Sequence, residues 1–147
     1  MYYLAYGSNM DEDQMAHRCP GAKLIGTGRL HGFQLEFNRH ATIVESENPD
    51  SLVPVAVWRI TPDDELRLDR YEGYPSYYIK EEHTVRMSDG SEINGMIYRM
   101  KHIRKAPPTR AYYNAIAGAY HELGLGFEIE LVLEPALKRA LDREKRP

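Results

Sequence analysis

The chain has 147 residues, of which 42% are hydrophobic and 28% are charged, a balance typical of a folded domain rather than of a disordered segment. Its 19 basic and 22 acidic residues give a net charge of −3 and are scattered, which argues against nucleic-acid binding because no basic patch or stripe forms. A chain of this length predicts one domain, residues 1–147, with a core large enough to fold without a disulfide or a metal.

The first part of the chain is predicted to contain a strand, a loop and a short helix. Residues Tyr2–Tyr6 form an apolar and aromatic run that ends at Gly7, which indicates a strand running into a loop. Ser8 and Asn9 are both favoured at helix N-caps, and Pro20-Gly21 would end the helix that follows.

Residues 23–60 have a mainly strand-like pattern. Apolar and polar residues alternate from Phe33 to Asn38, and a period of two marks a half-buried strand. Asn48-Pro49-Asp50 indicates a loop, and the run from Val53 to Ile60 predicts another strand.

A helix and a β-hairpin are predicted next. Thr61-Pro62-Asp63-Asp64 combines a Thr cap, a proline at the first helical position and two acidic residues, so a helix should begin here and end near Gly73. Residues 77–87 and 92–100 are predicted strands, joined by a hairpin turn at Ser88-Asp89-Gly90.

The last part of the chain is predicted to be helical. Pro107-Pro108-Thr109 opens a helix that Gly124 ends, and residues 134–145 indicate a final helix. The basic run Arg139–Arg146 is interpreted as a solvated helix face. Mostly antiparallel strands with a few attached helices predict an α+β fold, as a small closed or half-closed barrel.

The first candidate site is the loop Y-G-S-N-M, Tyr6 to Met10. A strand that ends in glycine, followed by small polar residues and a helix start, leaves several backbone N–H groups pointing into one space. Such groups bind a carboxylate or an oxyanion, and Gly7 would allow a close approach or a positive φ. A plain capped turn has the same residues, so the loop alone does not decide between a binding loop and a capped turn.

The second candidate is Glu72, at the end of a predicted helix and among Tyr71, Tyr74, Tyr77 and Tyr78. Desolvation by these rings would raise the pKa of the carboxyl and allow it both to take and to give a proton near neutral pH. The alternative is a surface glutamate in a turn, beside aromatic residues that belong to the core.

Other common catalytic and targeting signals are missing from the sequence. The six histidines show no metal-ligand spacing, and neither a G-x-S-x-G elbow nor a dinucleotide fingerprint is present, so we expect no metal and no cofactor. The single cysteine, Cys19, fits a reducing compartment, and no secretory signal or membrane-spanning run is seen. We therefore expect a soluble cytoplasmic protein that does not act at a membrane. The sequence does not indicate its oligomeric state.

Together, the strand ending in Y-G-S-N and the later L-D-x-x-E-G motif resemble the gamma-glutamylcyclotransferase-like family, which includes the plant-type avirulence-induced and gamma-glutamylamine cyclotransferase branches. The likeness extends to G-x-L-x-G-F-x-L-x-F over Gly28–Phe37 and to E-G-Y-P-x-x-Y over Glu72–Tyr78. It implies a small β-barrel with flanking helices and a pocket at one end. Glu72 would be the catalytic acid/base. The residues implied in substrate binding are Tyr6, Gly7, Ser8, Asn9, Met10, Tyr78 and Tyr112, with Tyr113 as the rival of Tyr112.

The reaction that this resemblance implies is intramolecular. The free α-amino group of a gamma-glutamyl amide attacks its own γ-carbonyl, closes the five-membered ring of 5-oxoproline and expels an amine, without a metal, a cofactor or a nucleophilic residue. The alternative is a non-catalytic protein that retains the pocket and binds a small ligand. The sequence leaves the identity of the leaving amine open.

Overall fold

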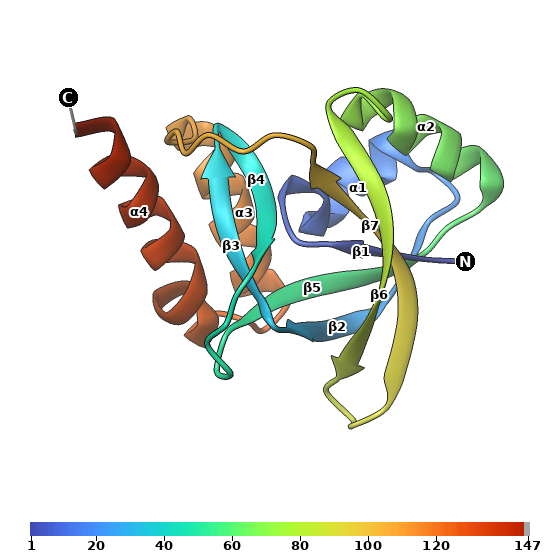
Figure 1. Ribbon diagram of the computed structural model, residues 1–147. Coiled ribbons are helices and arrows are strands. Elements are labelled where there is room, and N and C mark those ends of the chain that lie inside the picture. The colour runs from blue at the N-terminus through green and yellow to red at the C-terminus, as the bar shows by residue number, and fades with distance from the viewer. Residues whose placement is uncertain (146–147) are drawn as a thin grey trace.

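In the computed structural model, which describes residues 1–145, a closed five-stranded barrel stands beside a separate two-stranded sheet and four α-helices (Figure 1). The strands are β1 (Tyr2–Ala5), β2 (Lys23–His31), β3 (Phe33–Asn38), β4 (His40–Glu45), β5 (Leu52–Arg59), β6 (Tyr78–Met87) and β7 (Glu92–Met100). The helices are α1 (Glu12–Arg18), α2 (Pro62–Glu72), α3 (Arg110–Glu122) and α4 (Glu134–Lys145), with a 3-10 turn at Ser8–Met10 and a π-helical turn at Ile129–Leu133.

The barrel confirms the predicted α+β class. Its strand order is β1-β5-β2-β6-β7, and neighbouring strands are antiparallel except at the junction of β1 and β7, where Tyr3 pairs in parallel with Met96. Within the described residues, closure leaves the barrel without a free edge. Strand β5 is buried from Val53 to Trp58, which explains its nearly continuous apolar sequence.

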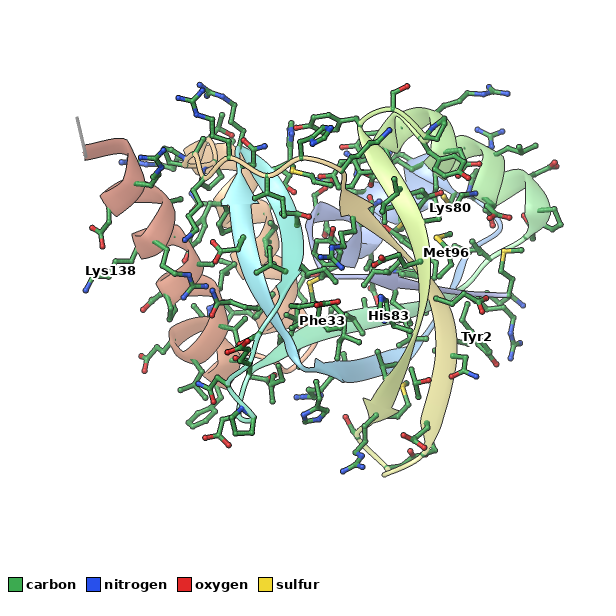
Figure 2. All side chains as sticks on the ribbon, in the orientation of Figure 1. Tyr2, Phe33, Lys80, His83, Met96 and Lys138 are labelled. Atoms are coloured by element: carbon green, nitrogen blue, oxygen red, sulfur yellow. The ribbon has the colours of Figure 1, made fainter. Side chains whose placement is uncertain are left out.

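The β3–β4 hairpin lies beside the barrel, and helix α4 packs along β3 (Figure 1). Phe33, at the start of β3, contacts the His83 ring of β6 edge-on with a centroid separation of 4.9 Å (Figure 2). On α4, Ala136 and Ala140 are fully buried, because only small side chains let a helix approach a sheet this closely.

The interpretation of Arg139 as part of a solvated helix face is wrong. Its Nε lies 3.2 Å from a carboxylate oxygen of Glu36, which is 2% exposed, and its Nη2 donates to the Leu35 carbonyl at 2.8 Å. A buried carboxylate needs charged partners, and α4 supplies the nearer one, since Lys105 Nζ lies 3.9 Å from the same oxygen. Arg146, the last residue of the predicted face, lies outside the described residues.

The start of α2 agrees with the sequence prediction, whereas the start of α1 does not. Thr61 and Asp64 form a reciprocal capping box, and Gly73 ends α2 with a φ of 64°. The predicted cap of α1 at Ser8 or Asn9 is wrong, because Asp11 accepts the hydrogen bond from the Gln14 N–H instead.

Candidate active site

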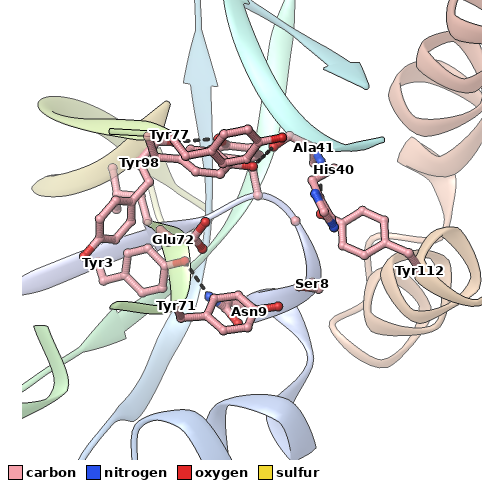
Figure 3. Close-up of a pocket in the computed structure, with 14 residues that line it drawn as sticks. Tyr3, Ser8, Asn9, His40, Ala41, Tyr71, Glu72, Tyr77, Tyr98 and Tyr112 are labelled. Atoms are coloured by element: carbon pink, nitrogen blue, oxygen red, sulfur yellow. Dashed lines mark hydrogen bonds between the residues drawn. The ribbon is translucent and has the colours of Figure 1, made fainter. Parts of the chain in front are cut away.

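A cavity of about 290 Å³ lies at the end of the barrel where β1 and β7 finish and β6 begins (Figure 3). The C-terminus of α2, the start of β4 and the first turn of α3 complete its wall, and half of the lining residues are tyrosines. The lining residues are Tyr3, Leu4, Tyr6, Gly7, Ser8, Asn9, His40, Ala41, Tyr71, Glu72, Tyr77, Tyr78, Tyr98 and Tyr112.

Glu72 is the last residue of α2, and its carboxyl points into the cavity between tyrosine rings (Figure 3). Burial raises the pKa of this carboxyl from 4.5 to about 7, while the positive charge of Arg18 acts in the opposite direction. A position at the negative end of a helix also disfavours the ionised form. No hydrogen bond within the described chain contributes to the pKa, so the carboxyl is free to exchange a proton with a ligand.

Three of the tyrosine hydroxyls are fixed by the main chain. The Tyr78 hydroxyl donates to the Ala41 carbonyl and the Ala41 N–H donates to the Tyr112 hydroxyl, both at 3.0 Å. The Tyr6 hydroxyl donates to the Tyr98 carbonyl at 2.5 Å. These bonds tie β1, β4, β6, β7 and α3 together, so the cavity has a rigid wall.

The loop of residues 6–10 contributes main-chain N–H groups at the cavity. Gly7 has a φ of −115°, so the predicted positive φ is not present. The glycine instead allows a close approach of other atoms to the main chain. The N–H groups of Gly7, Ser8 and Asn9 have no acceptor within residues 1–145, as expected at the start of a helical turn. The Met10 N–H donates to the Gly7 carbonyl at 3.0 Å, and the Met10 side chain is fully buried away from the cavity.

The side chains of the loop are held by other residues of the protein. Asn9 accepts a hydrogen bond from Arg18 at Oδ1 and donates from Nδ2 to the Tyr3 hydroxyl at 3.0 Å. Its carbonyl accepts from Trp58 Nε1 at 3.0 Å, and Ser8 Oγ accepts from Arg18 at 3.3 Å. The main-chain N–H groups of Gly7, Ser8 and Asn9 are therefore the donors of this loop that no acceptor in the described chain occupies.

Most of the sequence-predicted site residues lie around this one cavity. Those brought together are Tyr6, Gly7, Ser8, Asn9, Glu72, Tyr78 and Tyr112. Met10 does not line the cavity, and neither does Tyr113, which packs near Phe37 with ring centroids 6.1 Å apart. Tyr74, expected beside Glu72, is exposed, and Lys80 Nζ lies over its ring at 4.2 Å from the ring centroid.

The sequence did not indicate five of the lining residues, nor one residue beside the cavity. The lining residues are Tyr3, Leu4, His40, Ala41 and Tyr98, and the residue beside the cavity is Arg18. Tyr3 and Tyr98 come from strands far apart in the chain and meet edge-on with ring centroids 5.9 Å apart. Strand periodicity could have placed them on the same face as the site, but only once the barrel order was known.

A polar network anchors the helix turn that carries Glu72. Asp69, one turn earlier on α2, accepts a hydrogen bond from the Tyr98 hydroxyl at 2.6 Å and lies 2.9 Å from Lys80 Nζ. Glu65 also accepts from Lys80 at 3.0 Å. These bonds fix the end of α2 to β6 and β7, and so fix the place of the Glu72 backbone.

Two further observations concern residues 1–145 as a whole. No group of three or more His, Cys, Asp or Glu side chains in this range is arranged to hold a metal ion. No helix in the same range is both long and apolar enough to cross a membrane.

Comparisons with known proteins agree with this geometry. The family model described as gamma-glutamyl cyclotransferase, AIG2-like, matches residues 3–117. Gamma-glutamylcyclotransferases of Bos taurus and Homo sapiens are 32% and 31% identical over 141 residues, which cover 87% of this chain and 74% of each relative. A solved structure named gamma-glutamyl cyclotransferase superposes with a TM-score of 0.78 at 27% identity, and covers 99% of this chain and 87% of that one.

Proposed function

The chain belongs to the gamma-glutamyl cyclotransferase, AIG2-like family, and from this premise we propose that it converts a gamma-glutamyl compound to 5-oxoproline and a free amine. In this reaction the α-amino nitrogen bonds to the γ-carbonyl carbon, and the bond from that carbon to the leaving nitrogen breaks. The observation that carries the proposal is that one ionisable carboxyl, Glu72, lines the same small cavity as Gly7, Ser8 and Asn9, whose main-chain N–H groups have no acceptor within residues 1–145.

The rigid wall of the cavity supports an intramolecular reaction. The nucleophile and the electrophile belong to one molecule, so holding the substrate folded supplies much of the rate. Well-oriented intramolecular reactions reach effective molarities of about 10⁵–10⁸ M. A cavity of about 290 Å³ is at the small end of ligand pockets, which suits a glutamyl group.

Glu72 is proposed as the general acid/base. With its pKa raised to about 7 by burial, the carboxyl is partly ionised at neutral pH. It takes the proton that the α-ammonium must lose and returns a proton to the leaving nitrogen. Proton transfers of this kind contribute roughly 10²–10⁴-fold to the rate.

The N–H groups of Gly7, Ser8 and Asn9 are proposed to bind the negative part of the substrate. Among the described residues, the lining includes neither lysine nor arginine, so N–H and hydroxyl groups must donate to the α-carboxylate or to the oxyanion of the transition state. At the rim, Tyr71 and Tyr77 are 50% and 46% exposed, which leaves room for the amine part to extend outward.

The test is incubation of the protein with a panel of gamma-glutamyl amino acids, peptides and amines, with 5-oxoproline measured by mass spectrometry. Formation of 5-oxoproline from at least one compound supports the proposal and identifies the leaving amine. Thermal stabilisation by a panel member without product would contradict catalysis and support a protein that only binds the ligand.

A further inference from the structure

Arg18, the last residue of α1, connects the two halves of the site without lining the cavity. Its Nη1 donates to Asn9 Oδ1 and, at 3.3 Å, to Ser8 Oγ. The same guanidinium lies over the ring of Tyr71, with its carbon 3.7 Å from the ring centroid. Tyr71 directly precedes Glu72, so one side chain contacts both the binding turn and the helix end that carries the carboxyl.

This double contact requires the shape of arginine. A guanidinium donates hydrogen bonds in its plane while its face stacks on an aromatic ring, whereas a lysine ammonium has no such face. The loop begins the chain segment that leads into α1, and Tyr71 belongs to α2. Arg18 therefore connects the loop to the C-terminal end of α2.

Arg18 also sets the orientation of the Asn9 amide. Because Oδ1 faces the guanidinium, Nδ2 must face the Tyr3 hydroxyl, to which it donates at 3.0 Å. Tyr3 lines the cavity beside Glu72. A change at Arg18 would release the Asn9 amide and, through it, the Tyr3 ring.

The positive charge of Arg18 affects the pKa of Glu72. The titratable groups of other elements that line the same cavity are Tyr3, Tyr6, His40, Tyr78, Tyr98 and Tyr112. Burial raises the pKa of five of these, all the tyrosines, well above neutral pH, so they stay uncharged. Within residues 1–145, Arg18 is the charged group that lowers the pKa of Glu72 against the effect of burial.

We propose that Arg18 is a positioning residue, which fixes the binding turn and Tyr71 around Glu72 and places a positive charge next to the helix end that carries this carboxyl. The proposal rests on the proposed function for its catalytic consequence, but the placement and the charge effect are properties of the folded protein. The two can therefore be tested separately.

The first test is a ¹³C NMR titration of the Glu72 carboxyl, assigned by its disappearance in Glu72→Gln. We expect Arg18→Met to move the midpoint upward by about one pH unit, since a nearby opposite charge shifts a carboxyl by about 1–3 units. Arg18→Lys should stay close to the wild type. Arg67→Met, at an exposed arginine of α2, is the control. An unchanged midpoint in Arg18→Met would overturn the proposal, whether or not the protein is an enzyme.

The second test is steady-state kinetics on the best substrate of the panel. Arg18→Met should raise KM about tenfold and move the pH dependence of kcat/KM upward with the NMR midpoint. Arg18→Lys should raise KM but keep the pH dependence, because it retains the charge and loses the stacked geometry. Wild-type kinetics in both variants would overturn the positioning role, whereas a wild type without product would refute only the proposed reaction.

Discussion

A β-carbon on Gly7 would lie 3.2 Å from the hydroxyl oxygen of Tyr112. The end of β1 and the first turn of α3 thus meet at the cavity wall, where an added β-carbon would require its neighbours to move by a few tenths of an ångström. The same β-carbon would lie 3.3 Å from the Ala41 side chain. Gly7 therefore allows β1, β4 and α3 to pack closely at this point.

We expect Gly7→Ala to lower the free energy of unfolding by about 1–3 kcal/mol, on the scale of an overpacked core, and to raise KM. Denaturant unfolding and steady-state kinetics measure the two effects. The matched control is Gly118→Ala, at an exposed position of α3 where the added carbon meets nothing within 4 Å. There alanine should stabilise the helix by about 0.5–1 kcal/mol. A Gly7→Ala variant as stable and active as the wild type would contradict the packing argument.

Tyr112→Phe should destabilise the protein by about 1–3 kcal/mol, because the buried Ala41 N–H would lose its acceptor. It should also weaken substrate binding, since the hydroxyl lies at the cavity. Tyr113→Phe is the control: the neighbouring tyrosine does not line the cavity, and the change should cost less than about 0.5 kcal/mol. Equal effects of the two changes on KM would contradict the assignment of Tyr112 to the site.

The stability of the protein should depend on pH through Glu72. Burial raises the pKa of this carboxyl from 4.5 to about 7, so the folded state holds a proton that the unfolded chain has already lost. The Glu72 contribution to stability is therefore fully present below pH 4.5 and falls away as the pH rises to 7. Between pH 4.5 and pH 8, the free energy of unfolding of Glu72→Gln should rise by about 1–3 kcal/mol relative to that of the wild type.

Chemical denaturation at the two pH values measures this gain. Glu82→Gln, at an exposed glutamate of β6, is the control and should show no such gain. Parallel stability curves for the wild type and Glu72→Gln would mean that the carboxyl is solvated in the folded protein.

The pH dependence of kcat/KM should report the same group. If Glu72 acts first as a base, kcat/KM should rise about tenfold per pH unit below 7 and level off above it. The measurement is initial rate at low substrate concentration between pH 5 and pH 8. A rate that is constant over this range would exclude Glu72 as the group that accepts the proton.

The ends of helix α2 could be predicted from local signals in the sequence. Thr61, Asp64 and Gly73 define both ends of α2 through side-chain and backbone geometry that depends on near neighbours only. The start of α1 could not be predicted in this way, because Ser8 and Asn9 are used by Arg18 and Tyr3 and cannot cap the helix. The π-helical turn at Ile129–Leu133 has no local signal of its own.

The candidate site was predicted in part for a similar reason. The loop and Glu72 each belong to a motif within a short segment of the sequence, and the structure brings both to one cavity. Tyr3, Tyr98 and Arg18 join the site through pairings between distant parts of the chain. Such residues become visible only when the order of the barrel strands is known.

Glu72 is proposed to transfer the protons of the reaction, and this role is tested by the single-turnover rate of 5-oxoproline formation by Glu72→Gln at saturating substrate. We expect this rate to fall roughly 10²–10⁴-fold, with ligand-induced thermal stabilisation preserved and with Glu82→Gln at the wild-type rate. A Glu72→Gln variant that forms 5-oxoproline as fast as the wild type would contradict this role.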